Sequence, residues 1–138
     1  MLFTNDFLEK YALYLEQGRV IEPSSLTPFM KSYISFWIKK TGGAHYQYIN
    51  HVFFMLFSPS SKEDPKSYES ITLSYITNYL VKILVSFTKK QDKSSSSSFQ
   101  YRVYLDEVFI QLIDIWGFLV TYLPLLEILF ENVSKWNE

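Results

Sequence analysis

The spacing of apolar residues predicts that the chain is helical along most of its length. Apolar side chains recur at intervals of three and four, glycine and proline fall near segment ends, and alternating strand-like runs are hard to find. We therefore predict an all-α fold of five or six antiparallel helices in a single domain spanning residues 1–138. The helices would form either a bundle or a short α-solenoid stack of the HEAT type, although no convincing internal repeat supports the second arrangement.

Turn and capping residues divide the first half of the chain into three helices. Thr4 is a suitable N-cap for a first helix, which Gly18 would close. A second helix would begin with Thr27 as its cap and Pro28 at its first position, where the missing N–H is not needed. Two glycines then separate it from a third helix, predicted over about residues 44–57.

The second half is predicted to contain a long fourth helix, a loop and an interrupted helical stretch. One face of the fourth helix carries a row of apolar and aromatic residues that includes Tyr75 and Tyr79. The Lys- and Ser-rich segment at about 89–98 is predicted to be a flexible exposed loop, because five consecutive serines bury nothing useful. A break or sharp kink is expected between Gly117 and Pro124, because proline removes an intrahelical hydrogen bond.

The composition adds three constraints to this helical pattern. Aromatic residues make up 19% of the chain, with 12 Phe and 11 Tyr, so the core should be bulky and rather rigid. A formal net charge of −1 provides no general attraction to nucleic acid or anionic lipid. Cysteine is absent, which excludes disulfides and thiolate metal sites.

The N-terminal segment lacks the basic start of a signal peptide, so we expect an intracellular protein of the cytoplasm or nucleus.

The most apolar stretch, residues 115–126, raises the question of membrane insertion. A spanning helix needs about 20 apolar residues to cross a hydrocarbon core of about 30 Å. Here 12 residues separate Asp114 from Glu127. Each carboxylate would cost about 2.5 to 3.5 kcal/mol at the centre of an inserted helix. We therefore expect the chain not to insert in a membrane, and expect this stretch to lie either in the core or beneath a partner protein.

The sequence carries no recognisable pattern for catalysis, metal binding or cofactor binding. His45 and His51 are six residues apart and point in different directions on a helix, unlike the i, i+4 pair of a helical zinc site. The adjacent Asp106 and Glu107 also diverge, which makes them a poor acid–base pair. We predict a protein with no enzymatic activity and no metal or cofactor.

The sequence favours a protein–protein interaction module. We expect a scaffold, adaptor or regulatory subunit of a larger complex, which binds a partner helix or peptide, or a second copy of itself. Binding would use an apolar, aromatic-rich groove, because tyrosine and tryptophan concentrate binding energy at interfaces. The residues expected to anchor the partner are Trp37, Tyr46, Tyr48, Trp116 and Trp136.

The alternative function is that of a nucleic-acid-associated subunit. Lysine clusters near predicted helix C-terminal ends complement the helix dipole, but they could also contact phosphates beside aromatic platforms. The residues of this basic patch would be Lys39, Lys40, Lys89, Lys90 and Lys93. Such binding would weaken steeply with added salt, whereas binding in an apolar groove would change little.

Overall fold

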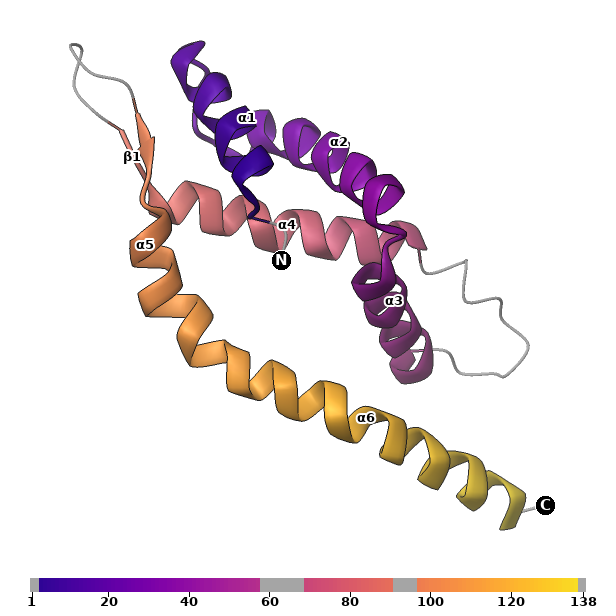
Figure 1. Cartoon of the computed structure of the whole chain (residues 1–138). Helices are drawn as coiled ribbons and strands as arrows, with labels where there is room; N and C mark the ends of the chain where they lie inside the picture. Colours follow the sequence, from indigo (N-terminus) through magenta and orange to yellow (C-terminus); the bar gives the residue numbers. More distant parts are fainter. Residues whose placement is uncertain (1–2, 58–68, 91–96, 137–138) are drawn as a thin grey trace. The chain divides into compact units, whose positions relative to one another are not determined.

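The chain is all-α, as the sequence predicts, with one short pair of two-residue strands. A computed structural model describes residues 3–57, 69–90 and 97–136 (Figure 1). Its elements are α1 (Asn5–Glu16), α2 (Pro23–Thr41), α3 (Ala44–Phe57), α4 (Glu69–Phe87), β1 (Thr88–Lys89), β2 (Ser98–Phe99), α5 (Tyr101–Tyr104), a π-helical turn η2 (Leu105–Phe109) and α6 (Ile110–Trp136). They fall into two compact units, Met1–Phe99 and Gln100–Glu138, each described separately below.

Local sequence signals set the ends of α1 as predicted. Thr4 is the N-cap, and its Oγ1 accepts a hydrogen bond from the amide of Phe7 at 3.3 Å. Just beyond the helix, Gly18 has a φ of 65°, a left-handed conformation that glycine adopts without steric cost. The hydroxyls of Thr4 and Tyr33 are hydrogen-bonded at 3.0 Å, so the start of α1 is attached to α2.

The second helix begins one turn earlier than predicted. Pro23 lies in its first turn, and Thr27 is inside the helix, where its Oγ1 donates to the carbonyl of Pro23 at 2.7 Å. Pro28 is also interior. The predicted start was wrong because either proline can occupy a first turn, and the sequence does not rank them. The end of α2 is confirmed, since Gly42 is a left-handed C-cap with a φ of 73°.

The core of the first unit contains an aromatic cluster contributed by α1, α2 and β2. Phe7 and Tyr11 of α1 are at most 1% exposed. Phe7 meets Tyr33 edge-on with ring centroids 4.9 Å apart, and Tyr11 meets Phe99 edge-on at 5.6 Å. Contacts of this kind add about 0.5 to 1.5 kcal/mol each beyond the burial of area. Much of the aromatic excess in the sequence is therefore used inside the first unit.

The fourth helix packs along α2 (Figure 1), and the face that carries its aromatic row is only partly buried. Its buried residues are Thr72, Thr77, Leu80, Val81, Ile83 and Leu84. Ile71, Tyr75 and Tyr79, on the face that the sequence pattern picks out, are exposed. The buried hydroxyl of Thr72 donates to Oδ1 of Asn50 at 2.7 Å, which satisfies polar atoms between α3 and α4. Aliphatic residues and threonines thus make the buried face of α4, and two of its tyrosines stay exposed.

Two short strands frame the segment predicted as a loop at 89–98. Strands β1 and β2 are antiparallel, with Thr88 opposite Phe99. The hydroxyls of Tyr11 and Thr88 are hydrogen-bonded at 2.9 Å in the core, so this ladder is attached to α1. Strands of two residues have no detectable periodicity, and the sequence therefore missed them. Residues 91–96 lie outside the described part of the chain, so the flexibility of that stretch stays a prediction.

The second unit is a continuous helical stretch from Tyr101 to Trp136 (Figure 1). α6 runs through both Gly117 and Pro124, so the predicted break between them is wrong. Pro124 removes one hydrogen bond from the helix, but the carbonyl that loses its donor belongs to Val120, an exposed residue. Water can bond such a carbonyl, and the helix therefore continues.

Two tyrosines of α1 provide a matched test of the core. The Tyr11 hydroxyl has Thr88 as its partner, whereas the buried Tyr14 hydroxyl has no hydrogen-bond partner among the described residues. We expect Tyr11→Phe to lower the free energy of unfolding by about 1 kcal/mol. Tyr14→Phe should leave it unchanged or raise it by up to about 1 kcal/mol, because a buried unsatisfied hydroxyl is removed. Urea unfolding followed by circular dichroism measures both; equal losses would contradict these assignments.

The buried tyrosines also make the fold sensitive to alkaline pH. Burial raises the pKa of Tyr11, Tyr14 and Tyr46 above the ordinary value of 10.0. The folded state holds these protons more tightly than the unfolded state, so their stabilisation is complete below a pH of about 10 and is lost as the pH rises through the folded pKa. We expect Tyr11→Phe to flatten the alkaline fall in unfolding free energy, measured by urea titration at increasing pH. Tyr75→Phe, on the exposed face of α4, is the control, and an unaltered slope in Tyr11→Phe would count against the account.

Candidate functional site

The principal candidate site is the surface of α6, which exposes large apolar side chains all around the helix. Phe118 is 60% exposed and Leu129 is 59% exposed. The other exposed members are Ile110, Leu112, Ile113, Ile115, Trp116, Leu119, Val120, Tyr122, Leu125, Leu126 and Ile128. Successive helical residues are rotated by about 100°, so this exposure is not confined to one side. A contiguous apolar surface of this extent is typical of an interaction site.

The polar residues of α6 lie on two different sides of the helix. Gln111 and Asp114 are three positions apart in the sequence and share one side of the helix. Glu127 follows Asp114 by 13 residues, which rotates it by about 140° around the axis. A helix that rests on a flat apolar surface keeps its polar residues in one stripe along its whole length. Thr121 and Asn132 share the side of Asp114, but Glu127 departs from it, so the polar residues of α6 do not form one narrow stripe and its chemistry suits a binding site that covers it on more than one side.

The same stretch is acidic. Between Val103 and Leu129 the sequence contains Asp106, Glu107, Asp114 and Glu127 and has no Lys, Arg or His, which gives a formal charge of −4. The near-neutral charge of the whole chain therefore conceals a local excess of carboxylates beside the exposed apolar residues. A complementary surface would be apolar and would offer hydrogen-bond donors or basic groups.

Two described helical stretches are long and apolar enough to cross a membrane. They are Glu69–Phe87 and Tyr101–Leu129. The apolar window of the first is 33% buried, and packing of α4 in the first unit explains its composition. The window of the second is 0% buried, so packing within the second unit does not explain its composition.

The anchor residues predicted from the sequence are divided between the two units. Trp37 and Tyr48 are half-buried in the first unit. Tyr46 is also half-buried there, and its hydroxyl donates to the carbonyl of Glu69 at 2.6 Å, which joins α3 to α4. Trp116 is exposed on α6, whereas the side chain of Trp136 lies outside the described ones. The sequence left open whether the aliphatic neighbours of Trp116 lie in the core or on a surface that a partner covers, because the same pattern occurs in a buried helix.

The predicted basic patch is not assembled in the first unit. Lys39 and Lys40 are exposed at the C-terminal end of α2, beside the start of α4. Lys89 and Lys90 follow the C-terminal end of α4 (Figure 1). The 19 residues of α4 place about 28 Å between the two ends. Lys93 lies outside the described residues. The structure therefore separates the two pairs that it describes.

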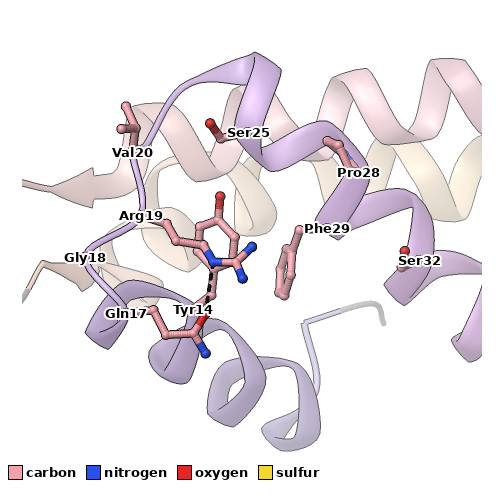
Figure 2. A pocket seen from close by; sticks show the side chains of 9 residues that line it. All are labelled: Tyr14, Gln17, Gly18, Arg19, Val20, Ser25, Pro28, Phe29 and Ser32. Carbon is pink, nitrogen blue, oxygen red and sulfur yellow. Dashed lines mark hydrogen bonds between the residues drawn. The ribbon is translucent and has the colours of Figure 1, made fainter.

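A second candidate site is a hollow of about 730 Å³ where α1 ends and α2 begins (Figure 2). Its lining residues are Tyr14, Gln17, Gly18, Arg19, Val20, Ser25, Pro28, Phe29 and Ser32. The guanidinium carbon of Arg19 is 5.2 Å from the centroid of the Tyr14 ring, and its Nε donates to Oε1 of Gln17 at 2.9 Å. The rings of Tyr14 and Phe29 are in tilted contact, with centroids 4.8 Å apart. One cation thus lies above an aromatic wall.

A smaller hollow of about 260 Å³ shares this wall. Tyr14, Gln17, Arg19 and Phe29 line both hollows, and Lys10 with Leu13 completes the smaller one. The Nζ of Lys10 is 3.3 Å from the Asp6 carboxylate and 4.0 Å from the centroid of the Phe36 ring. Lys10 already has partners, so Arg19 is the cation better placed to receive a ligand.

The described residues form no metal centre, and comparison of the whole chain with known proteins found no match. Among residues 3–57, 69–90 and 97–136, no group of three or more His, Asp or Glu could hold a metal ion. No protein-family model, curated protein or solved structure matches this chain.

The exposure of α6 predicts a measurable effect on dye binding. Hydrophobic dyes such as ANS bind exposed apolar surface. We expect Leu119→Asp to reduce ANS fluorescence, because it places a charge in the middle of the apolar surface. Ile71→Asp, at a similarly exposed position on α4 that lines neither hollow, should have a much smaller effect. Equal fluorescence of the two variants would show that α6 does not present this surface in solution.

Proposed function

We propose that this chain is a non-enzymatic interaction module that binds another protein through α6. The continuous apolar exposure from Ile110 to Leu129 is the observation that supports the proposal. Removal of apolar surface from water contributes roughly 25 cal/mol per Å², and a stable interface buries about 800 Å² on each partner. A helix about 30 Å long that is covered on several sides can supply much of that area.

A protein partner matches α6 better than a lipid bilayer does. Asp114 and Glu127 are 13 residues apart, or about 20 Å along the helix axis, and a hydrocarbon core is about 30 Å thick. A spanning α6 would therefore keep at least one carboxylate among the lipid tails. A protein can instead give each carboxylate a hydrogen-bond donor or a basic partner. A helix lying in the plane of a membrane is a poorer match still, because it requires a single polar stripe.

The same geometry indicates the form of the partner. Because the polar residues of α6 are on two sides, a shallow groove would bury Asp114 or Glu127 against apolar atoms. A partner that contributes at least two helices could leave a polar or open position beside each carboxylate. α6 would then be the inserted helix of an intermolecular bundle, a form of helix-in-groove recognition.

Nucleic-acid binding has less support. The two described lysine pairs are at opposite ends of α4, and the stretch with the largest exposed apolar surface has a formal charge of −4. Phosphate backbones would be repelled by that stretch.

Site-specific photo-crosslinking in the native cell tests the proposal. A photoreactive amino acid at position 119 of the full chain should give a discrete covalent adduct with one protein, because this position lies in the middle of the proposed contact. The same amino acid at position 71, an exposed position on α4, is the matched control and should give none. Adducts with lipid only, or no difference between the two positions, would overturn the proposal.

Mutation of the same surface provides an independent measurement. Phe118→Asp and Leu119→Asp, each in a chain without the photoreactive residue, should weaken co-purification of the partner identified by crosslinking by about tenfold or more, because a charge in an apolar interface is costly to desolvate. Urea unfolding of these variants should retain the transition of the first unit. Undiminished recovery would exclude α6 as the binding surface.

A further inference from the structure

We propose that the hollow between α1 and α2 binds a small carboxylate with a flat apolar body. This proposal concerns the first unit alone and is independent of any partner of α6. It rests on the charge of the rim, on a buried hydroxyl in the wall, and on the apolar side chains between them.

The rim supplies a cation with unused donors. A guanidinium has five N–H donors in a fixed fork, and the described partner of Arg19 is a single amide oxygen, Oε1 of Gln17. Both side chains are exposed, so little energy holds this contact. A carboxylate can accept two parallel hydrogen bonds from the fork and would replace the amide oxygen with a stronger acceptor. None of the nine lining residues is acidic, and the carboxylate of Glu22, which is close enough to act on Tyr14, is outside the lining and accepts a hydrogen bond from Ser24.

The wall supplies a buried polar group that needs a partner. Tyr14 is 4% exposed, and its hydroxyl has no hydrogen-bond partner among the described residues. In Figure 2 the Arg19 side chain crosses in front of the Tyr14 ring, whose hydroxyl points toward the Ser25 side of the hollow. Pairing with a carboxylate draws the exposed Arg19 side chain away from the ring and opens a path to this hydroxyl. A polar atom of the ligand can then bond it.

The remaining walls select for an apolar body. Phe29 faces the Arg19 guanidinium, and Pro28 and Val20 complete the apolar lining (Figure 2). An aromatic or branched aliphatic group can stack on Phe29 while its carboxylate lies at Arg19. Ser25 and Ser32 offer further hydroxyls on the α2 side. A strongly hydrated anion such as phosphate gains less here, because one guanidinium replaces only part of its hydration.

Nuclear magnetic resonance of the full ¹⁵N-labelled chain tests this site with phenylacetate as the probe. We expect saturable amide shifts that are confined to residues lining the hollow. Phenylacetamide, the neutral isostere, should bind at least about tenfold more weakly, because it lacks the charge that Arg19 recognises. An acetylated tripeptide with a C-terminal phenylalanine carboxylate, compared with its amide, distinguishes a peptide terminus from a free small acid as the natural source.

Variants separate binding from folding. Arg19→Met keeps the length and apolar stem of the side chain and should weaken phenylacetate binding by about tenfold. Tyr14→Phe retains the ring, which keeps the wall intact, and should weaken it about threefold. Arg102→Met, which removes an exposed arginine from the second unit, should have no effect. Shifts that do not saturate, equal affinity for the acid and the amide, or full binding by Arg19→Met would each overturn the proposal, and none of them bears on crosslinking through α6.

Discussion

The exposed apolar surface of α6 is the constraint on which the functional account depends. A helix of 27 residues whose apolar side chains contact water along most of its described length is unfavourable by the hydrophobic effect, which scales with exposed apolar area. Helical propensity alone contributes little stability to such a segment. A partner that covers α6 must bury apolar atoms on several sides. It must also provide hydrogen-bond donors, basic groups or water for the carboxylates of Asp114 and Glu127. Both requirements are met more readily by protein than by lipid.

The first unit contrasts with this because it buries an aromatic core of its own, although some apolar side chains of α1, α2 and α4 remain exposed. The aromatic residues of α1 pack on α2 and β2, and several buried hydroxyls have partners, including Tyr11 with Thr88 and Thr72 with Asn50. The Tyr14 hydroxyl is an exception within the described core, and Tyr14 lines the hollow where α1 ends and α2 begins. A buried hydroxyl without a hydrogen-bond partner lowers the stability of the fold slightly, and a ligand that bonds this hydroxyl would restore that stability. Stability and candidate binding are therefore linked at this one residue.

The sequence predicted the helical class and those boundaries that local chemistry determines. The Thr4 cap and the left-handed Gly42 needed no tertiary information, because each acts on its own helix end. One prediction failed where tertiary context decides: Pro124 did not end α6, because an exposed helix can leave a carbonyl to water. Periodicity also identified one apolar face of α4 without showing that Tyr75 and Tyr79 on it are exposed while Ile83 is buried. The hollow could not be predicted, since it joins Arg19 to rings from two helices. Periodicity identified the α6 stretch as apolar, but it cannot distinguish a helix that is buried in its own chain from one whose apolar side chains are exposed.

Amide hydrogen exchange, read by mass spectrometry, tests the central claim most directly. The account predicts that amides between Ile110 and Leu129 exchange much faster than those of α1 and α2 in the free chain at low concentration. It also predicts that exchange of these amides slows when the partner identified by crosslinking is added. Protection of this stretch in the free monomer equal to that of α1 and α2, with no change on adding the partner, would contradict it.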